Sequence, residues 1–93
     1  MGWPVMHSRS PRLHNAWLKR FRLPGYYAPL PVEPGRLEAA LRALPALNFA
    51  GCNVTLPHKE EAVRIADRVD PAAKAIGAAN CVVVQRDGSL AAF

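Results

Sequence analysis

The sequence predicts an α/β domain of three layers, in which a mostly parallel sheet carries helices on both faces and closes with a C-terminal β-hairpin. Short apolar runs suited to strands alternate with amphipathic segments of about ten residues, which is the pattern of βαβ units. The Asp87-Gly88 pair lies between two strand-like runs and indicates a tight hairpin turn. The 93 residues suffice for one hydrophobic core, so residues 1–93 are expected to form a single domain.

The first predicted elements are a helix and a strand. Ser10 is a candidate N-cap and Pro11 suits the first helical position, so a helix is expected to begin here. It ends a little past Phe21, because Pro24-Gly25 cannot continue it. Residues 26–32 then read as a strand, in which one of two adjacent tyrosines points inward and borders a pocket.

Two further helices are predicted from apolar residues that recur every three or four positions. The first runs from Pro34 to before Pro45, and a short strand follows at residues 51–55. The second begins at Pro57, whose fixed φ suits a first helical turn. The apolar positions are Leu37, Ala40, Leu41 and Leu44 in one helix, and Ala62, Ile65, Ala66 and Val69 in the other.

The last part of the chain predicts a short helical turn and the hairpin. Asp70-Pro71 ends the preceding helix and starts a turn through Ala75, which Gly77 breaks. Residues 81–85 have the strongest strand pattern of the chain, and residues 89–93 form the returning strand.

The net charge of +5 lies in the first third of the chain, since seven bases balance seven acids from Glu33 onward. Such a basic beginning suits a solvated face, or a field that attracts a small anion. A nucleic-acid-binding domain is disfavoured, because the charges are not interleaved with exposed aromatic residues. The basic residues instead surround an apolar set that predicts an amphipathic helix docked on its neighbours: Leu13, Ala16, Trp17 and Phe21.

Metal, disulfide and membrane functions are not expected. Cys52 and Cys81 have no companion at a zinc-ligand spacing, so they read as buried free thiols of a reducing, cytoplasmic compartment. His7, His14 and His58 are spaced as polar loop or helix-face residues rather than metal ligands. No apolar run approaches the roughly 18 residues of a membrane span.

A binding site is predicted beyond the carboxyl ends of the strands, where ligands of open α/β sheets lie. Loops that carry five polar residues should converge there: Ser8, Ser10, Thr55, Lys59 and Asn80. Hydroxyl and amide groups suit a polyol, and a lysine adds a charge or a proton-transfer group. A cation in a first helical turn opposes the helix dipole and costs about 0.3–1 kcal/mol, so we expect Lys59 to have a functional role there. The alternative is a solvated lysine neutralised by Glu60 and Glu61.

Three blocks of the sequence together resemble the substrate-binding domain of the shikimate dehydrogenase family. They are Gly2-Trp3-Pro4-Val5-Met6-His7-Ser8-Arg9-Ser10-Pro11, Asn53-Val54-Thr55-Leu56-Pro57-His58-Lys59-Glu60 and Ile76-Gly77-Ala78-Ala79-Asn80. The resemblance implies a partial domain over residues 1–93 that lacks its first strand and precedes a Rossmann domain for NADP. Two residues depart from the family pattern, Cys81 in place of threonine and Ala92 in place of glycine.

The resemblance also implies residue roles. Ser8 and Ser10 would bind the carboxylate of shikimate, and Thr55, Lys59 and Asn80 its ring hydroxyls. Lys59 would be the general acid or base in the NADPH-dependent, reversible reduction of 3-dehydroshikimate, with a partner aspartate that follows the hairpin in the family. No G-x-G-x-x-G loop is present, so this chain holds no cofactor-binding residue and is expected to be inactive alone.

Two alternatives and one question of assembly stay open. A quinate/shikimate dehydrogenase would accept a broader range of substrates, and a non-catalytic module would retain only the pocket. The expected partner is a small molecule, without nucleic acid or membrane, and a homodimer is left open.

Overall fold

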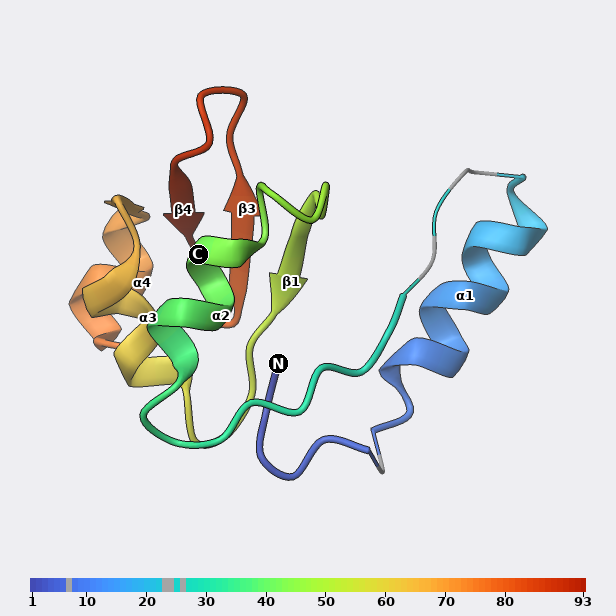
Figure 1. The fold of residues 1–93 in the computed structure, drawn as a ribbon, viewed down its shortest axis with the longest axis horizontal. Coiled ribbons are helices and arrows are strands. Elements are labelled where there is room, and N and C mark those ends of the chain that lie inside the picture. Colours follow the sequence, from blue (N-terminus) through green and yellow to red (C-terminus); the bar gives the residue numbers. More distant parts are fainter. Residues whose placement is uncertain (7, 23–24, 26) are drawn as a thin grey trace.

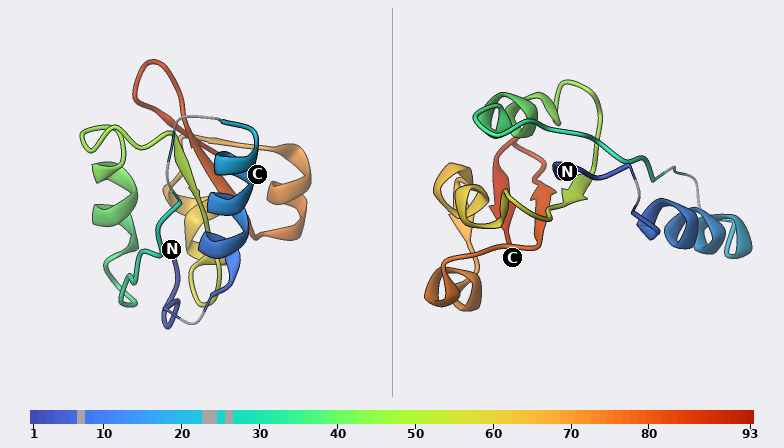
Figure 2. Two further views of the ribbon diagram at one scale, coloured as in Figure 1. Left: turned by 90° about the vertical axis from the view of Figure 1, so that its right-hand side faces the viewer. Right: turned by 90° about the horizontal axis from the view of Figure 1, so that it is seen from below.

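A computed structural model describes residues 1–6, 8–22, 25 and 27–93. It contains a four-stranded sheet with strand order β1-β3-β4-β2. The elements are α1 (Ser10–Arg20), α2 (Leu37–Ala43), β1 (Gly51–Asn53), α3 (Lys59–Ile65), β2 (Arg68–Val69), α4 (Pro71–Ile76), β3 (Cys81–Val84) and β4 (Leu90–Ala92). Helices α2 and α4 lie on opposite sides of the sheet (Figures 1 and 2), which confirms the predicted layers of an α/β domain.

The sheet is mixed rather than mostly parallel. Of the neighbouring pairs, β1–β3 and β3–β4 are antiparallel and β2–β4 is parallel, so β3 runs against the other three strands. The hairpin of β3 and β4 was predicted from its Asp-Gly turn, and it is present, with Gly88 at φ 84° in the turn. The direction of β3 was mispredicted, because β3 runs antiparallel to β1 and not parallel to it. Strand pairing is set by contacts distant in sequence, which hydrophobic periodicity does not record.

The third helix is shorter than its apolar periodicity predicts. It ends at Ile65, and Ala66 is already extended. Arg68 and Val69 pair with β4 as a strand, so Val69 belongs to the sheet and not to the helix. Pro57 lies in the turn before α3, because the helix begins only at Lys59. The next helix starts as expected, where the Asp70 side chain accepts a 3.1 Å hydrogen bond from Ala72 N–H.

The segment before α2 is extended but forms no regular strand within the described residues. Its one ladder contact is an isolated parallel bridge between Gly2 and Pro31. Gly2 in turn lies against the loop after β1, where a Cβ at this position would collide with Thr55 Cγ2. A glycine at position 2 is therefore required for this close approach. Residues 1–3 thus join the segment around Pro31 to the end of β1.

The hydrophobic core lies between α2, α3 and the sheet. Its fully buried large apolar side chains are Leu37, Leu41, Leu44, Val82 and Leu90. α1 contributes no buried residue and stands apart from the sheet (Figure 1). Trp17, one of the apolar residues by which this helix was predicted to dock, is 48% exposed and does not belong to the core. Leu13 and Phe21 of the same helical face are exposed as well.

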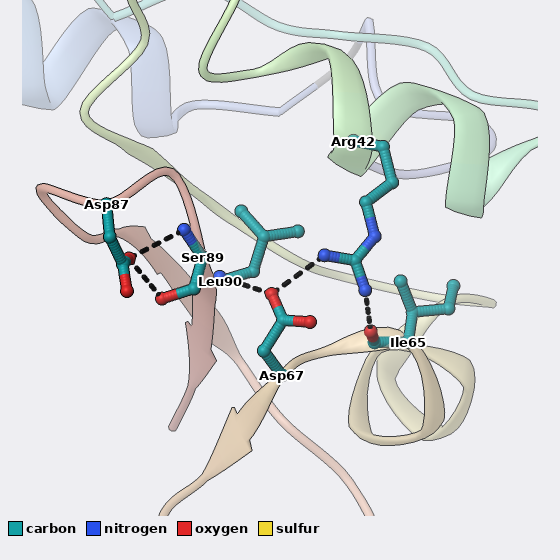
Figure 3. A network of polar contacts seen from close by, with 6 residues as sticks. All are labelled: Arg42, Ile65, Asp67, Asp87, Ser89 and Leu90. Carbon is teal, nitrogen blue, oxygen red and sulfur yellow. Dashed lines mark hydrogen bonds and ion pairs between the residues drawn. The ribbon is translucent and has the colours of Figure 1, made fainter.

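A polar network holds the end of α3 beside the sheet (Figure 3). Asp67 Oδ2 accepts hydrogen bonds from Arg42 Nη1 at 2.7 Å and from Leu90 N at 2.8 Å. Arg42 Nη2 donates at 2.7 Å to Ile65 O, one of the carbonyls left free at the end of α3. The network joins α2, the end of α3 and β4.

Candidate functional site

A cavity of about 440 Å³ opens where the N-terminal segment, the extended residues 27–29 and the end of β1 meet. Its wall contains three of the predicted site residues, Ser8, Ser10 and Thr55. It also contains Tyr27 and Asn53. The apolar part of the wall is formed by Met1, Trp3, Pro4, Val5, Pro11, Ala28, Pro29 and Leu56. Such a mixture of apolar lining and a few polar groups is typical of small-molecule sites.

The two serines are positioned by the turn that leads into α1. Ser8 N–H donates to Val5 O at 3.0 Å, and Ser8 Oγ accepts from Ser10 N–H at 3.2 Å. Ser10 is the first residue of α1, and the N-cap position belongs to Arg9, whose side chain makes no capping hydrogen bond. The prediction of Ser10 as N-cap is therefore wrong, because Ser8 satisfies that backbone N–H. In the described part of the chain, the Ser10 hydroxyl makes no hydrogen bond, because the backbone N–H of Ser10 and not its hydroxyl pairs with Ser8.

Thr55 lies in the loop after β1 and lines the same cavity as the two serines. Its N–H donates to Met1 O at 2.9 Å, and its carbonyl accepts from His58 N–H at 3.0 Å. The backbone of Thr55 is thus held on both sides, while the residue is exposed.

Cys52 is a half-buried free thiol, and burial raises its pKa above the ordinary value. Cys81 is likewise free and half-buried, so neither thiol is fully buried as the sequence had suggested.

Lys59 and Asn80 lie next to this loop but outside the cavity wall. Lys59 O accepts a 2.9 Å hydrogen bond from Ala79 N, and Asn80 O accepts one of 2.7 Å from Val54 N. The structure therefore brings the predicted loops together through their backbones. The ion pairs among the described residues are Arg36–Glu33 and Arg42–Asp67, so Lys59 makes no direct ion pair with Glu60 or Glu61 in this part of the chain.

Two polar residues of the cavity wall, Asn53 and Tyr27, are not among the five predicted site residues. Asn53 Nδ2 donates to the hydroxyl of Tyr27 at 2.7 Å, which joins the end of β1 to the extended segment. Tyr27 confirms the expectation that one tyrosine of the pair borders the pocket, whereas Tyr26 lies outside the described residues. Asn53 stands at the start of the second sequence block, and its place at the end of a strand was the signal available.

The two histidines that the structure describes, His14 and His58, pack against other residues of the chain. His58 is 1% exposed, and its Nε2 lies 2.6 Å from Val32 O, so it is a core residue rather than a polar loop residue. His14 is half-buried on α1 and stacks on Tyr27, while His7 lies outside the described residues. Within the described ranges, no three His, Cys, Asp or Glu side chains gather as metal ligands. No helix of these ranges is long and apolar enough to cross a bilayer.

Residues 1–82 match the model of the shikimate dehydrogenase substrate binding domain. The chain belongs to this family. Shikimate dehydrogenase (NADP(+)) of Paramagnetospirillum magneticum is 56% identical over 97% of the chain and 33% of its own length. The enzyme of the same name from Rhodospirillum rubrum is 57% identical over 97% of the chain and 32% of its length. The chain thus spans about a third of the length of the curated relatives it matches.

Solved structures agree with the family and with the fold. Shikimate dehydrogenase of Aquifex aeolicus superposes with a TM-score of 0.93 at 37% identity, over 99% of this chain and 34% of that one. Shikimate 5-dehydrogenase of Thermus thermophilus in complex with shikimate gives 0.92 at 39% identity, over 99% and 35%. A 5-ketofructose reductase of Gluconobacter gives 0.92 at 26% identity, over 98% and 32%.

Proposed function

We propose that this chain is the shikimate-binding part of an NADP-dependent shikimate dehydrogenase, which reversibly reduces 3-dehydroshikimate in the shikimate pathway. The observation that carries the proposal is the cavity in which Ser8, Ser10 and Thr55 come together from two distant loops. These residues stand in the blocks that resemble the family. The match to a Thermus enzyme solved with shikimate supports the same ligand.

The roles proposed for the individual residues are those that the family resemblance implies, and the chemistry of each group suits them. The hydroxyls of Ser8 and Ser10 donate to the shikimate carboxylate, and five cations precede the first acid of the chain, a distribution that favours an anion nearby. The Thr55 hydroxyl and the Asn80 amide each donate and accept, which suits the ring hydroxyls. We place Lys59 at the hydroxyl that becomes the ketone.

Lys59 is the proposed acid and base. When shikimate is oxidised, the neutral Nζ takes the proton of the reacting hydroxyl, and in the reverse direction the ammonium returns it. Lys59 opens α3 one short turn beyond Thr55, so its flexible side chain starts beside the proposed ring-hydroxyl site.

NADP supplies hydride transfer when it is bound to the enzyme. The residues of this chain do not fit a dinucleotide, because the sequence contains no G-x-G-x-x-G loop. We therefore assign the cofactor to the two thirds of the relatives' length that the chain does not span. A cytoplasmic location accords with the free thiols of Cys52 and Cys81.

The direct test is a titration of the ¹⁵N-labelled 93-residue chain with shikimate, followed by NMR. We expect saturable shifts in the amides of Ser8, Ser10 and Thr55, and none at Ser89 in the hairpin turn. The methyl ester of shikimate should bind more weakly, because it lacks the charged carboxylate. Absence of saturable shifts would refute the proposal.

Parallel titrations separate the second candidates. The 5-ketofructose reductase among the structural neighbours makes a different polyol substrate a specific alternative. Tighter binding of 5-ketofructose than of shikimate would favour it. Equal affinity for quinate and shikimate would favour the quinate/shikimate type. If a chimera of this chain with the rest of the Paramagnetospirillum enzyme binds shikimate without turnover, a non-catalytic module is indicated.

A further inference from the structure

Among the described residues, one hydrogen bond joins the side chains of two residues of the cavity wall, Tyr27 and Asn53. Asn53 Nδ2 lies 2.7 Å from the Tyr27 hydroxyl, although the two residues are 26 positions apart. Both line the cavity together with the serines and Thr55. The contact therefore orders a polar group at the point where a ligand would meet it, the end of β1.

Tyr27 is itself fixed by α1. Asn15 Nδ2 donates to Tyr27 O at 2.7 Å, and Asn15 Oδ1 accepts from Tyr27 N–H at 2.6 Å. The Tyr27 ring stacks on the His14 ring with 4.5 Å between centroids and 10° between planes. The backbone and the ring of Tyr27 are thus both held by α1. Its hydroxyl oxygen is thereby fixed in the position where it accepts from Asn53.

The Asn53 side chain needs such a partner because its amide torsion is intrinsically broad. Its residue is exposed, so packing does not fix the amide. One N–H donated to Tyr27 leaves the Oδ1 lone pairs and the second N–H for another group. An amide ordered before binding loses less entropy when the ligand arrives.

We propose that Tyr27 is a positioning residue of the cavity, whose hydroxyl holds the Asn53 amide in place for a hydroxyl group of the bound polyol. This inference rests on the proposed function of the cavity. Tyr27 acts through Asn53, and α1 acts through Tyr27, so a helix without buried residues contributes to ligand recognition.

The test is a double-mutant cycle on shikimate affinity in the 93-residue chain, measured by NMR titration. Tyr27→Phe removes one oxygen and keeps the ring that stacks on His14. We expect it to weaken binding about three- to ten-fold, the scale of one neutral hydrogen bond. In an Asn53→Ala background, Tyr27→Phe should have no further effect, because the group that it positions is gone.

Two controls keep the outcomes distinct. Ser89→Ala removes a hydroxyl that bonds Asp87 at 2.6 Å, far along the chain from the cavity, and should leave affinity unchanged. The thermal midpoint of Tyr27→Phe should stay within a degree or so of the wild type, since a surface hydrogen bond contributes little to stability. Additive losses in the cycle, or wild-type affinity of Tyr27→Phe, would overturn the inference alone. Failure of the wild-type chain to bind shikimate would overturn the proposed function and this inference with it.

Discussion

Ser8, Ser10 and Thr55 line one cavity, although they come from loops that are more than forty positions apart in the sequence. Their convergence was predictable, because polar residues at strand ends and helix starts face the same edge of an α/β sheet. The Tyr27–Asn53 contact was not predictable, since it depends on how α1 holds the extended segment through Asn15. No local pattern records a docking of this kind.

Ser10→Ala tests the carboxylate site. In the chimera with the Paramagnetospirillum enzyme, we expect it to raise KM for shikimate about tenfold, because a hydrogen bond to a charged group is worth about 1.5–3 kcal/mol. The thermal midpoint should not fall, because Ser8 rather than Ser10 satisfies the backbone at the start of α1. A lower midpoint with unchanged KM would mean that Ser10 serves the helix and not the ligand.

Lys59→Ala tests the proton-transfer role in the same chimera. We expect kcat to fall by about 10²–10⁴, the scale of a lost general acid or base, while KM changes less. Lys74→Ala is the matched control, because Lys74 is an exposed lysine in the last turn of α4. If Lys59→Ala and Lys74→Ala retain similar kcat values, Lys59 is a solvated lysine at a helix start.

Among the elements, the segment from α3 to β2 was the hardest to predict. Its apolar residues keep helical spacing through Val69, yet the helix ends at Ile65. Arg42, which is distant in sequence, donates to Ile65 O at the end of the helix, and Asp67 binds both Arg42 and the Leu90 N–H of β4. Capping by tertiary contacts of this kind cannot be read from periodicity. The short helix α4 was predictable, because Asp70 and Gly77 are local caps.

Asp67→Asn tests the network between α2, α3 and β4. Arg42, and then Leu90 N–H, hold the pKa of the Asp67 carboxyl below its ordinary value. A carboxyl whose pKa is lower in the folded state stabilises the fold above its unfolded pKa of about 3.9, and this contribution is lost as the pH falls through the folded pKa. The thermal midpoint of the wild type should therefore drop more steeply below about pH 4 than that of Asp67→Asn.

Glu33→Gln is the control for this titration, because its ion pair with Arg36 is exposed and 4.0 Å long. It should retain the wild-type dependence on pH. Equal acid sensitivity of Asp67→Asn and the wild type would show that the network contributes no pH-dependent stability.

On the scale of the whole molecule, stability and recognition reside in different parts. The core lies between α2, α3 and the sheet, whereas the cavity is built by the N-terminal segment, residues 27–29 and the end of β1. Leu41→Ala should therefore destabilise the chain by about 2–5 kcal/mol in urea unfolding, because Leu41 is 0% exposed. Trp17→Ala should change stability by less than about 1 kcal/mol, since its ring is half exposed. A larger loss of stability in Trp17→Ala than in Leu41→Ala would mean that α1 contributes to the core.

The isolated 93-residue chain should not oxidise shikimate with NADP in a steady-state assay, because its residues offer no dinucleotide site. Turnover clearly above that of Lys59→Ala would contradict this expectation.

The basic N-terminal third also permits a check for nucleic-acid binding. We expect such binding to be absent, or lost at about 200 mM salt.

The separate position of α1 has a consequence for binding equilibria. None of its residues is buried, so opening this helix exposes little apolar surface and costs little free energy. Ser10 belongs to α1 and Tyr27 is held by it, so the cavity is complete only in the fraction of molecules in which α1 is docked. The apparent dissociation constant is the intrinsic one divided by that fraction. A substitution that frays α1 therefore weakens binding without touching the ligand, and saturating ligand slows amide hydrogen exchange in α1 more than in α2.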